Sequence, residues 1–307
     1  MADSLAIGLH FERLGGQSED GFMALHSPVQ QTPGGTPYLT HPGVVVLARP
    51  QTNLAGLAGF LSGYGEDSPF PEYLNDPTPL PDSTQLCKVA GQLCYMSFGR
   101  KRSYNVDAKR YFDNLKSGGH GSVFEHATFS LLLYGISRSV THELVRHRPG
   151  MSFSQQSQRY VSGRMLRFVE RPEYAVDARL HEQFLQRIER VAAEYAGITE
   201  RILEMQQAGT QLLSAEARTD LRKKVQQTAR SVLPNETEAP LVVTGNARAW
   251  RHVISMRADA HAETEIRELA VRIFLCLYQT DPVLFSDYAL EQLPDGTYTV
   301  KAEYEKI

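Results

Sequence analysis

The feature that most constrains this fold is a long amphipathic segment at residues 178–207. Its apolar side chains recur at spacings of three and four residues, which places them along one side of a helix. These side chains are Leu180, Phe184, Ile188, Val191, Tyr195, Ile198, Ile202 and Met205. The segment therefore predicts a single long helix with one apolar face.

Other segments alternate between strand-like and helical patterns. Apolar, β-rich runs predict strands at 43–48, 126–135 and 165–170. Ser137 is a favourable N-cap for a helix that runs through Val145 or beyond. Further helices are expected at 83–93, 106–116, 215–233 and in one or two segments between 241 and 280. A hairpin is expected around Asp295 and Gly296, so the chain predicts an α+β fold.

Two segments outside these elements are rich in turn-forming residues. Residues 1–42 are polar and predict an irregular N-terminal arm, which leaves 43–307 as one domain. Residues 62–82 contain five prolines together with glycine, aspartate and serine, and they predict a long loop. Loops of this length are usually functional or mobile.

Composition and charge restrict the partners and the compartment. The net charge of -3 provides no general positive field for nucleic acid or an anionic membrane, so any anion site requires a local basic cluster. The three cysteines, Cys87, Cys94 and Cys276, imply neither a disulfide framework nor a zinc pair. The chain shows no signal peptide and no apolar run long enough to cross a bilayer, which favours the cytoplasm.

Residues 137–160 form the basic cluster that such a site requires. No acidic residue lies between Glu143 and Glu170, and serine and glutamine side chains at 152–158 add hydroxyl and amide groups. The cationic side chains are Arg138, Arg146, His147, Arg148 and Arg159. Guanidinium groups combined with short polar groups suit phosphate and pyrophosphate. An isolated Arg-His-Arg would favour a solvated basic face at a helix C-terminus, but the serines and the Arg-Tyr pair that follow favour an anion site.

A second polar segment, 245–265, predicts a helix that is dense in arginine, histidine and asparagine. Arg257 and His261 are four residues apart and share a helix face. The preceding turns contribute Asn246, Arg248 and His252. The segment taken alone is equally consistent with a ligand site and with a structural network of satisfied charges.

Several other motifs carry less information. Residues 120–126 place glycines beside two histidines, which allows close backbone approach to a ligand but is more typical of structural histidines. His142 and His147 resemble a zinc-protease motif, yet a spacing of five rotates them roughly 140° around a helix, so no metal site is predicted. The chain lacks the glycine-rich dinucleotide fingerprint, and Ser157 lacks the flanking glycines of a hydrolase nucleophile.

The segment 146–160 resembles the signature of the flavin-dependent thymidylate synthases, in which Arg-His-Arg is followed at a fixed distance by a serine and then by Arg-Tyr. Five other segments resemble blocks of the same family and occur in the family order. They are 124–126, 135–148, 230–234, 243–252 and 256–265. Because the order of these blocks is preserved over about residues 80–290, the chain is identified as a member of this family.

The resemblance implies an antiparallel sheet flanked by helices and a homotetramer whose active sites form where subunits meet. Each site would hold FAD in an extended groove, with a nucleotide stacked against the flavin. NADPH would reduce the flavin, and methylenetetrahydrofolate would supply the carbon for C5 methylation of dUMP to dTMP. The domain 43–307 would then be catalytic, with neither nucleic acid nor membrane as a partner.

The resemblance also implies roles for individual residues. FAD would be bound by His126, Arg146, His147, Arg148, Asn246, Arg248, His252 and His261. The nucleotide would be bound by Glu143, Gln155, Ser157, Gln158, Arg159, Arg230 and Arg257. Arg159 and Arg230 suit its phosphate, and the Arg257 guanidinium suits the uracil edge, where it would stabilise negative charge as C5 becomes nucleophilic. Arg257, Ser157 and His261 are the catalytic candidates, with Ser157 as a hydrogen-bonding group and not a covalent nucleophile.

The spacer between Arg-His-Arg and Ser157 departs from the family pattern, because eight residues, 149–156, replace seven. The longer spacer keeps UMP open as an alternative substrate, as in nucleoside antibiotic pathways, and C5 hydroxymethylation is a more distant variant. Two alternatives come from other classes: a nucleic-acid-binding module and a flavin-binding protein without transfer activity. Few aromatic residues accompany the basic segment, which disfavours the first, and the presence of Arg159, Arg257 and His261 disfavours the second.

Overall fold

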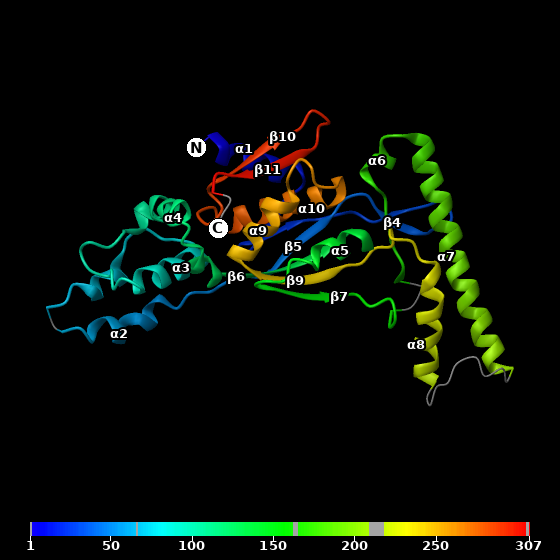
Figure 1. Cartoon of the computed structure of the whole chain (residues 1–307), viewed down its shortest axis with the longest axis horizontal. Coiled ribbons are helices and arrows are strands. Elements are labelled where there is room, and N and C mark those ends of the chain that lie inside the picture. Colours follow the sequence, from blue (N-terminus) through cyan, green and yellow to red (C-terminus); the bar gives the residue numbers. More distant parts are fainter. Residues whose placement is uncertain (1, 66, 162–164, 209–217, 305–306) are drawn as a thin grey trace.

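The centre of the protein is a six-stranded antiparallel sheet with the strand order β1-β2-β5-β6-β9-β7. Four of these strands, β5, β6, β9 and β7, are labelled in Figure 1. The computed structural model describes residues 2–65, 67–161, 165–208, 218–304 and 307. Every second side chain along β6 and β9 is buried, because successive residues of a strand point to opposite faces of the sheet. The strands are β1 (Gln17–Glu19), β2 (Phe22–Leu25), β5 (Gly43–Ala48), β6 (Thr128–Tyr134), β7 (Met151–Gln155) and β9 (Leu241–Asn246).

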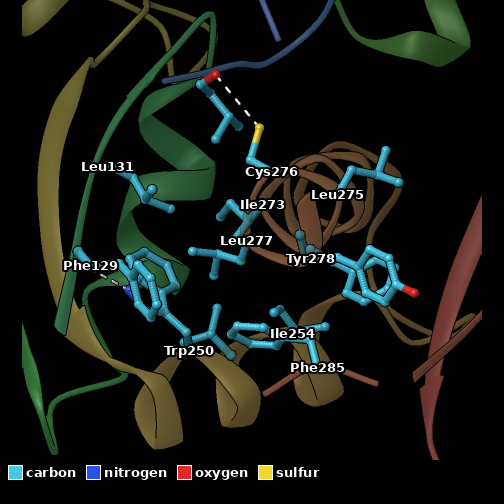
Figure 2. Packing of buried hydrophobic residues seen from close by; sticks show 14 of the residues in the cluster. Phe129, Leu131, Trp250, Ile254, Ile273, Leu275, Cys276, Leu277, Tyr278 and Phe285 are labelled. Carbon is cyan, nitrogen blue, oxygen red and sulfur yellow. Dashed lines mark hydrogen bonds between the residues drawn. The ribbon is translucent and has the colours of Figure 1, made fainter. Parts of the chain in front are cut away.

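The main core lies between this sheet and the helices α10 (Thr264–Thr280), α9 (Ala247–Arg257) and α1 (Ala2–Arg13). Helix α10 packs against β2 and β5, and both α9 and α1 pack against α10. Figure 2 shows Trp250 of α9 beside Phe129 of β6, and its indole N–H donates to the Phe129 carbonyl at 3.3 Å. Each large apolar side chain buried in this way contributes about 1.5–3 kcal/mol to folding.

A smaller three-stranded sheet lies beside the long helix of the chain. It consists of β3 (Gln30–Gln31), β4 (Pro37–Leu39) and β8 (Phe168–Val169), with β4 and β8 parallel. Phe184 and Ile188 of α7 (Ala178–Gln207) pack against Tyr38 and Phe168, forming a second apolar core. The Asp177 carboxylate caps α7 by accepting from the Leu180 N–H at 2.8 Å. The short helix α6 (Pro172–Ala175) precedes α7, and α8 (Arg218–Ala229) packs along it (Figure 1).

The opposite end of the molecule in Figure 1 contains α2 (Ala58–Ser62), α3 (Asp82–Leu93) and α4 (Ala108–Ser117). A third apolar cluster joins Leu61, Tyr73 and Phe98 there. Tyr73 belongs to a short 3-10 helix, Phe70–Asn75.

Two further elements complete the described fold. Helix α5 (Arg138–Leu144) follows β6, and the Ser137 hydroxyl caps it by accepting from the Val140 N–H at 3.3 Å. The hairpin of β10 (Tyr288–Gln292) and β11 (Tyr298–Ala302) lies near the C-terminus. None of the described helices is both long enough and apolar enough to span a membrane.

The α+β class, the helix at 178–207, the strand at 43–48, the N-cap at Ser137 and the C-terminal hairpin are confirmed. The antiparallel sheet with flanking helices is confirmed as well. The start expected at 215 for the next helix lies outside the described residues, and the described part, Arg218–Ala229, continues as a 3-10 helix over Arg230–Val232.

The prediction that residues 1–42 are irregular was wrong. They form α1 and four short strands, and Ile7, Phe11 and Leu25 are buried in the main core. The loop expected at 62–82 contains the 3-10 helix with the buried Tyr73. The strands β7 and β9 were also missed. These segments are short or polar, and their burial comes from distant partners, so local composition does not reveal them.

Candidate active site

A cavity of about 570 Å³ opens where α5, β7 and α9 meet. Its wall combines cationic, polar and apolar side chains. The charged and polar ones are Glu125, Arg146, His147, Asn246, Arg248 and His252. The remainder of the wall is Pro149, Gly150, Met151, Ala249 and Ile307. Two guanidinium groups, two imidazoles, an amide and one carboxylate therefore line one space whose wall also includes apolar residues.

Strand pairing brings these residues together from distant parts of the chain. Helix α5 ends at Leu144, and the chain turns through Arg146 and His147 into β7. Met151, the first residue of β7, pairs with Gly245 near the end of β9. The next residue, Asn246, caps α9 by accepting from the Ala249 N–H at 2.8 Å. The Arg-His-Arg turn consequently lies beside the N-terminus of α9, where helix dipoles favour negative charge.

The longer spacer does not disturb β7. Its ladder with β9 runs without a break from Met151 opposite Gly245 to Gln155 opposite Leu241. The Met151 N–H donates to the Arg148 carbonyl at 3.2 Å, which closes a tight turn ahead of the strand. The spacer thus forms a turn followed by a regular strand, and the turn itself is part of the cavity wall.

Gly150 is required at the tip of this turn. Its φ of +70° is unfavourable for a residue with a side chain, and an added Cβ would lie 2.7 Å from Nδ2 of Asn246. Gly35 provides a matched control, because its φ is +84° but an added Cβ would meet nothing within 4 Å. We expect Gly35→Ala to cost about 1–2 kcal/mol through the backbone alone, and Gly150→Ala to cost about 1 kcal/mol more because it also disturbs the α9 cap. Denaturant unfolding measures both; equal losses would show that the contact with Asn246 is unimportant.

Arg257 connects the cavity to α5. Its Nε donates to Nε2 of His147 at 2.9 Å, and its Nη1 donates to Oε2 of Glu143 at 2.7 Å. The ring of His252 meets that of His147 edge to face, with centroids 5.4 Å apart. Burial, together with the positive charge of Arg257 and the proximity of His252, lowers the pKa of His147 to about 4. The His147 imidazole is therefore neutral at neutral pH.

Glu125 is a cavity residue that the sequence interpretation missed. It accepts from Nη1 of Arg248 at 2.7 Å, and an added Cβ at Gly121 would lie 2.8 Å from Nε of the same arginine. Within the segment 124–126, the glutamate lines the cavity although the histidine was the predicted residue. Ala249 and Ile307 were also missed, and Ile307 had no signal because it lies outside every motif.

Not all predicted flavin-site residues line the cavity. Arg146, His147, Asn246, Arg248 and His252 do. His126, Arg148 and His261 do not, and all three are exposed in the single chain. His261 follows α9, and its backbone N–H donates to the Asp259 carboxylate at 2.8 Å.

Of the residues predicted to bind the nucleotide, some also lie near the cavity and others do not. Glu143 and Arg257 are linked to the cavity by His147. Arg257 donates hydrogen bonds to both residues, and His147 is part of the cavity wall. The others lie beyond the cavity wall, along and after β7 and after α8: Gln155, Ser157, Gln158, Arg159 and Arg230. Nε2 of Gln155 donates to the Thr141 hydroxyl at 3.2 Å, and the exposed Arg159 lies over the ring of Tyr160. One chain therefore does not gather the whole predicted set around one cavity.

The cavity wall combines arginine and imidazole side chains with apolar residues, and this combination suits an anionic ligand that also has an apolar part. The family model described as "Thymidylate synthase complementing protein" matches residues 75–283. The chain belongs to the flavin-dependent thymidylate synthase family.

Individual relatives agree with this assignment. A flavin-dependent thymidylate synthase from Corynebacterium diphtheriae is 41% identical over 224 residues, which cover 73% of this chain and 86% of that protein. One from Mycobacterium sp. (strain KMS) is 43% identical over 213 residues, 69% of this chain and 82% of its own length. One from Mycobacterium leprae is 39% identical over 212 residues, with the same two coverages. All three alignments therefore span most of both proteins.

Proposed function

We propose that this protein methylates dUMP at C5 to give dTMP, with FAD as cofactor, methylenetetrahydrofolate as carbon donor and NADPH as reductant. The observation that carries the proposal is the convergence of Arg146, His147, Asn246, Arg248 and His252 on one cavity in a chain of this family. The relatives are thymidylate synthases by name, which favours dUMP over UMP and over binding without transfer. We assign the fold of that family to residues 43–307, and residues 1–42 extend its central sheet with β1 and β2 and pack α1 against α10.

The chemistry of the cavity wall fits FAD. Arg146 and Arg248 supply charged donors for a pyrophosphate, and the α9 N-terminus adds a favourable dipole. Pro149, Met151 and Ala249 supply apolar surface for a flat ring system. When bound, FAD would supply the redox step by taking a hydride from NADPH and passing it to the transferred carbon, while the protein orients the reactants.

The remaining candidate residues would act on the nucleotide. Arg257 would stabilise negative charge on the uracil ring as C5 attacks the carbon donor, an effect that a preorganised guanidinium supplies at low reorganisation cost. Arg159 and Arg230 would hold the phosphate, and Ser157, Gln155 and Gln158 would donate or accept hydrogen bonds. Arg257, His261 and Ser157 remain the catalytic candidates. His126 and Arg148 remain candidates for binding FAD.

Within one chain, several candidate nucleotide-binding residues lie away from the cavity that the candidate FAD residues line. This separation supports a homotetramer whose active sites form where subunits meet. Ser157, Arg159 and Arg230 do not line the cavity of their own chain. A partner subunit would have to bring an equivalent set to each cavity, so each site would draw on more than one chain. The three free cysteines support a reducing compartment, and we propose the cytoplasm.

Product analysis tests the proposed function directly. The protein is incubated without oxygen with FAD, NADPH and methylenetetrahydrofolate, and with dUMP or UMP in separate tubes. We expect a product one CH2 heavier from dUMP, detected by mass spectrometry. Comparable conversion of UMP would replace the proposal with the alternative substrate, and no product from either tube would replace it with a flavoprotein that lacks transfer activity.

The longer turn provides a specificity prediction. Deleting Pro149 restores the seven-residue spacer and keeps Gly150 and Met151 against α9 and β9. We expect the ratio of kcat/KM for dUMP over UMP to change by roughly tenfold, which corresponds to about 1.4 kcal/mol. Pro149→Ala, which keeps the length, is the control and should leave the ratio near the wild-type value. An unchanged ratio in a deletion variant that still binds FAD would remove the turn from substrate choice.

A further inference from the structure

The hydrogen bond between Arg257 and His147 fixes the protonation pattern of the imidazole. A guanidinium has only N–H donors and no acceptor. Nε2 of His147, which lies 2.9 Å from Nε of Arg257, must therefore present its lone pair. In a neutral ring the single N–H is then on Nδ1.

Both partners keep unused donors. Arg257 employs Nε toward His147 and Nη1 toward Glu143, and within the described residues its Nη2 amine makes no hydrogen bond. Nδ1 of His147 has no partner in the described part of the chain either. His147 is itself part of the cavity wall, whereas Arg257 is not. The pair therefore offers one donor from the wall of the cavity and another from the guanidinium behind it.

The two anchors of Arg257 come from the same short segment. Glu143 is in the last turn of α5, and His147 lies in the turn that follows, whereas Arg257 is the last residue of α9. The Arg257 side chain is 25% exposed and the Glu143 side chain is 39% exposed, so the pair is partly shielded from water. Two fixed acceptors orient a planar guanidinium more strictly than one, because they define both its position and its plane.

We propose that His147 is a bridging residue in a fixed tautomer: its Nε2, together with Glu143, positions Arg257 for the nucleotide, while its Nδ1–H donates to the ligand of the cavity. This inference rests on the proposed function, which identifies the cavity ligand as FAD and the target of Arg257 as dUMP. Glu143 and His147 are positioning residues toward Arg257. Toward FAD, His147 is a direct binding residue.

Two substitutions separate the two roles of the ring. In His147→Asn the side-chain amide reaches the position of Nδ1, so the donor toward the cavity is kept and the acceptor for Arg257 is lost. In His147→Gln the amide oxygen reaches the position of Nε2, so the acceptor for Arg257 is kept and the donor toward the cavity is lost. The two variants carry the same amide group and differ by one methylene, which sets the position of the amide.

The measurements are the Kd of FAD by flavin fluorescence, the Kd of dUMP by calorimetry, and kcat and KM for dUMP at saturating FAD. Losing a hydrogen bond to a charged group or to a ligand raises the Kd by roughly tenfold or more. We expect His147→Gln to raise the Kd of FAD by that factor with little change for dUMP. We expect His147→Asn to raise the Kd and KM of dUMP with little change for FAD. A purely structural histidine would shift both ligands together in both variants, and that result would overturn the proposal.

A measurement on the unsubstituted protein tests the fixed tautomer even where a variant does not fold. The 15N shifts of His147, assigned by comparison with a variant that lacks it, report which ring nitrogen carries the proton. We expect the proton on Nδ1; a proton on Nε2 would overturn the proposal. This measurement needs neither FAD nor turnover, so a failure of the proposed function would appear separately, as absence of FAD binding or of product.

Discussion

Replacing Arg257 with alanine is expected to leave FAD bound and to lower kcat/KM for dUMP by roughly 10²–10³-fold, the loss typical of one preorganised donor for a developing negative charge. Arg257 is not part of the cavity wall, so its removal takes no contact from the ligand there. Water can replace the donor that His147 loses, and the Kd of FAD should therefore stay within about threefold of the wild-type value. Flavin titration and steady-state kinetics on the same preparation measure both quantities.

Arg248→Ala is the matched control, because it removes another guanidinium from the same helix. Arg248 does line the cavity, where it donates to Glu125 at 2.7 Å. We expect this variant to raise the Kd of FAD by roughly tenfold or more, and to recover much of its turnover when FAD is saturating. Wild-type turnover in Arg257→Ala, or equal loss of FAD in both variants, would contradict the assignment of Arg257 to the nucleotide.

Substituting asparagine for Asp287 is expected to destabilise the fold by about 3–5 kcal/mol, because it leaves buried cations without their counter-ion. The carboxylate accepts from both terminal nitrogens of Arg251, at 2.8 and 2.7 Å, and from Nζ of Lys116 at 2.8 Å. The side chains of Arg251, Asp287 and Lys116 are at most 1% exposed. Because Arg251 belongs to α9, beside His252, the loss should also loosen the cavity wall. Chemical unfolding measures the free energy of unfolding. FAD titration measures the Kd of FAD, which should rise if the cavity wall is loosened.

The pH dependence gives a second test of this network. Burial alone would raise the pKa of Asp287, but the hydrogen bonds and charges of Arg251 and Lys116 outweigh it and hold that pKa below the ordinary value of 3.8. A carboxyl group with a lowered pKa stabilises the native state above the unfolded-state pKa, and this contribution is lost as the pH falls through the native pKa. The difference between Asp287→Asn and wild type should therefore be constant near neutral pH and shrink below about pH 3.8.

Glu291→Gln is the control for this prediction. Glu291 pairs with Lys301 at 2.6 Å on the same C-terminal hairpin region, but both side chains are about half exposed. Exposed pairs of this kind contribute about 0–1 kcal/mol. A loss in Asp287→Asn no larger than that of Glu291→Gln would mean that water or a neighbouring group replaces the missing carboxylate.

The local elements of the fold were predictable because their signals are local. The apolar stripe of 178–207 and the β-branched run of 43–48 determine α7 and β5 with the expected bounds. Ser137 determines the start of α5 because capping depends on residues three positions apart. The density of guanidinium groups predicted an anion site at 146–148, whereas the polar segment 245–265 was linked to the same ligand only by the resemblance to the family.

The shape of the site was decided only by the tertiary structure. His147 and Arg257 are 110 residues apart, and no local pattern pairs them. The pairing of β7 with β9 brings them together, yet β7 is a short, largely polar strand whose burial depends on its neighbours. Glu125, Ile307 and the buried part of 1–42 were missed for the same reason. Periodicity and capping are encoded within a few residues, whereas sheet register, ion pairing and cavity walls depend on surfaces that meet only when the chain is folded.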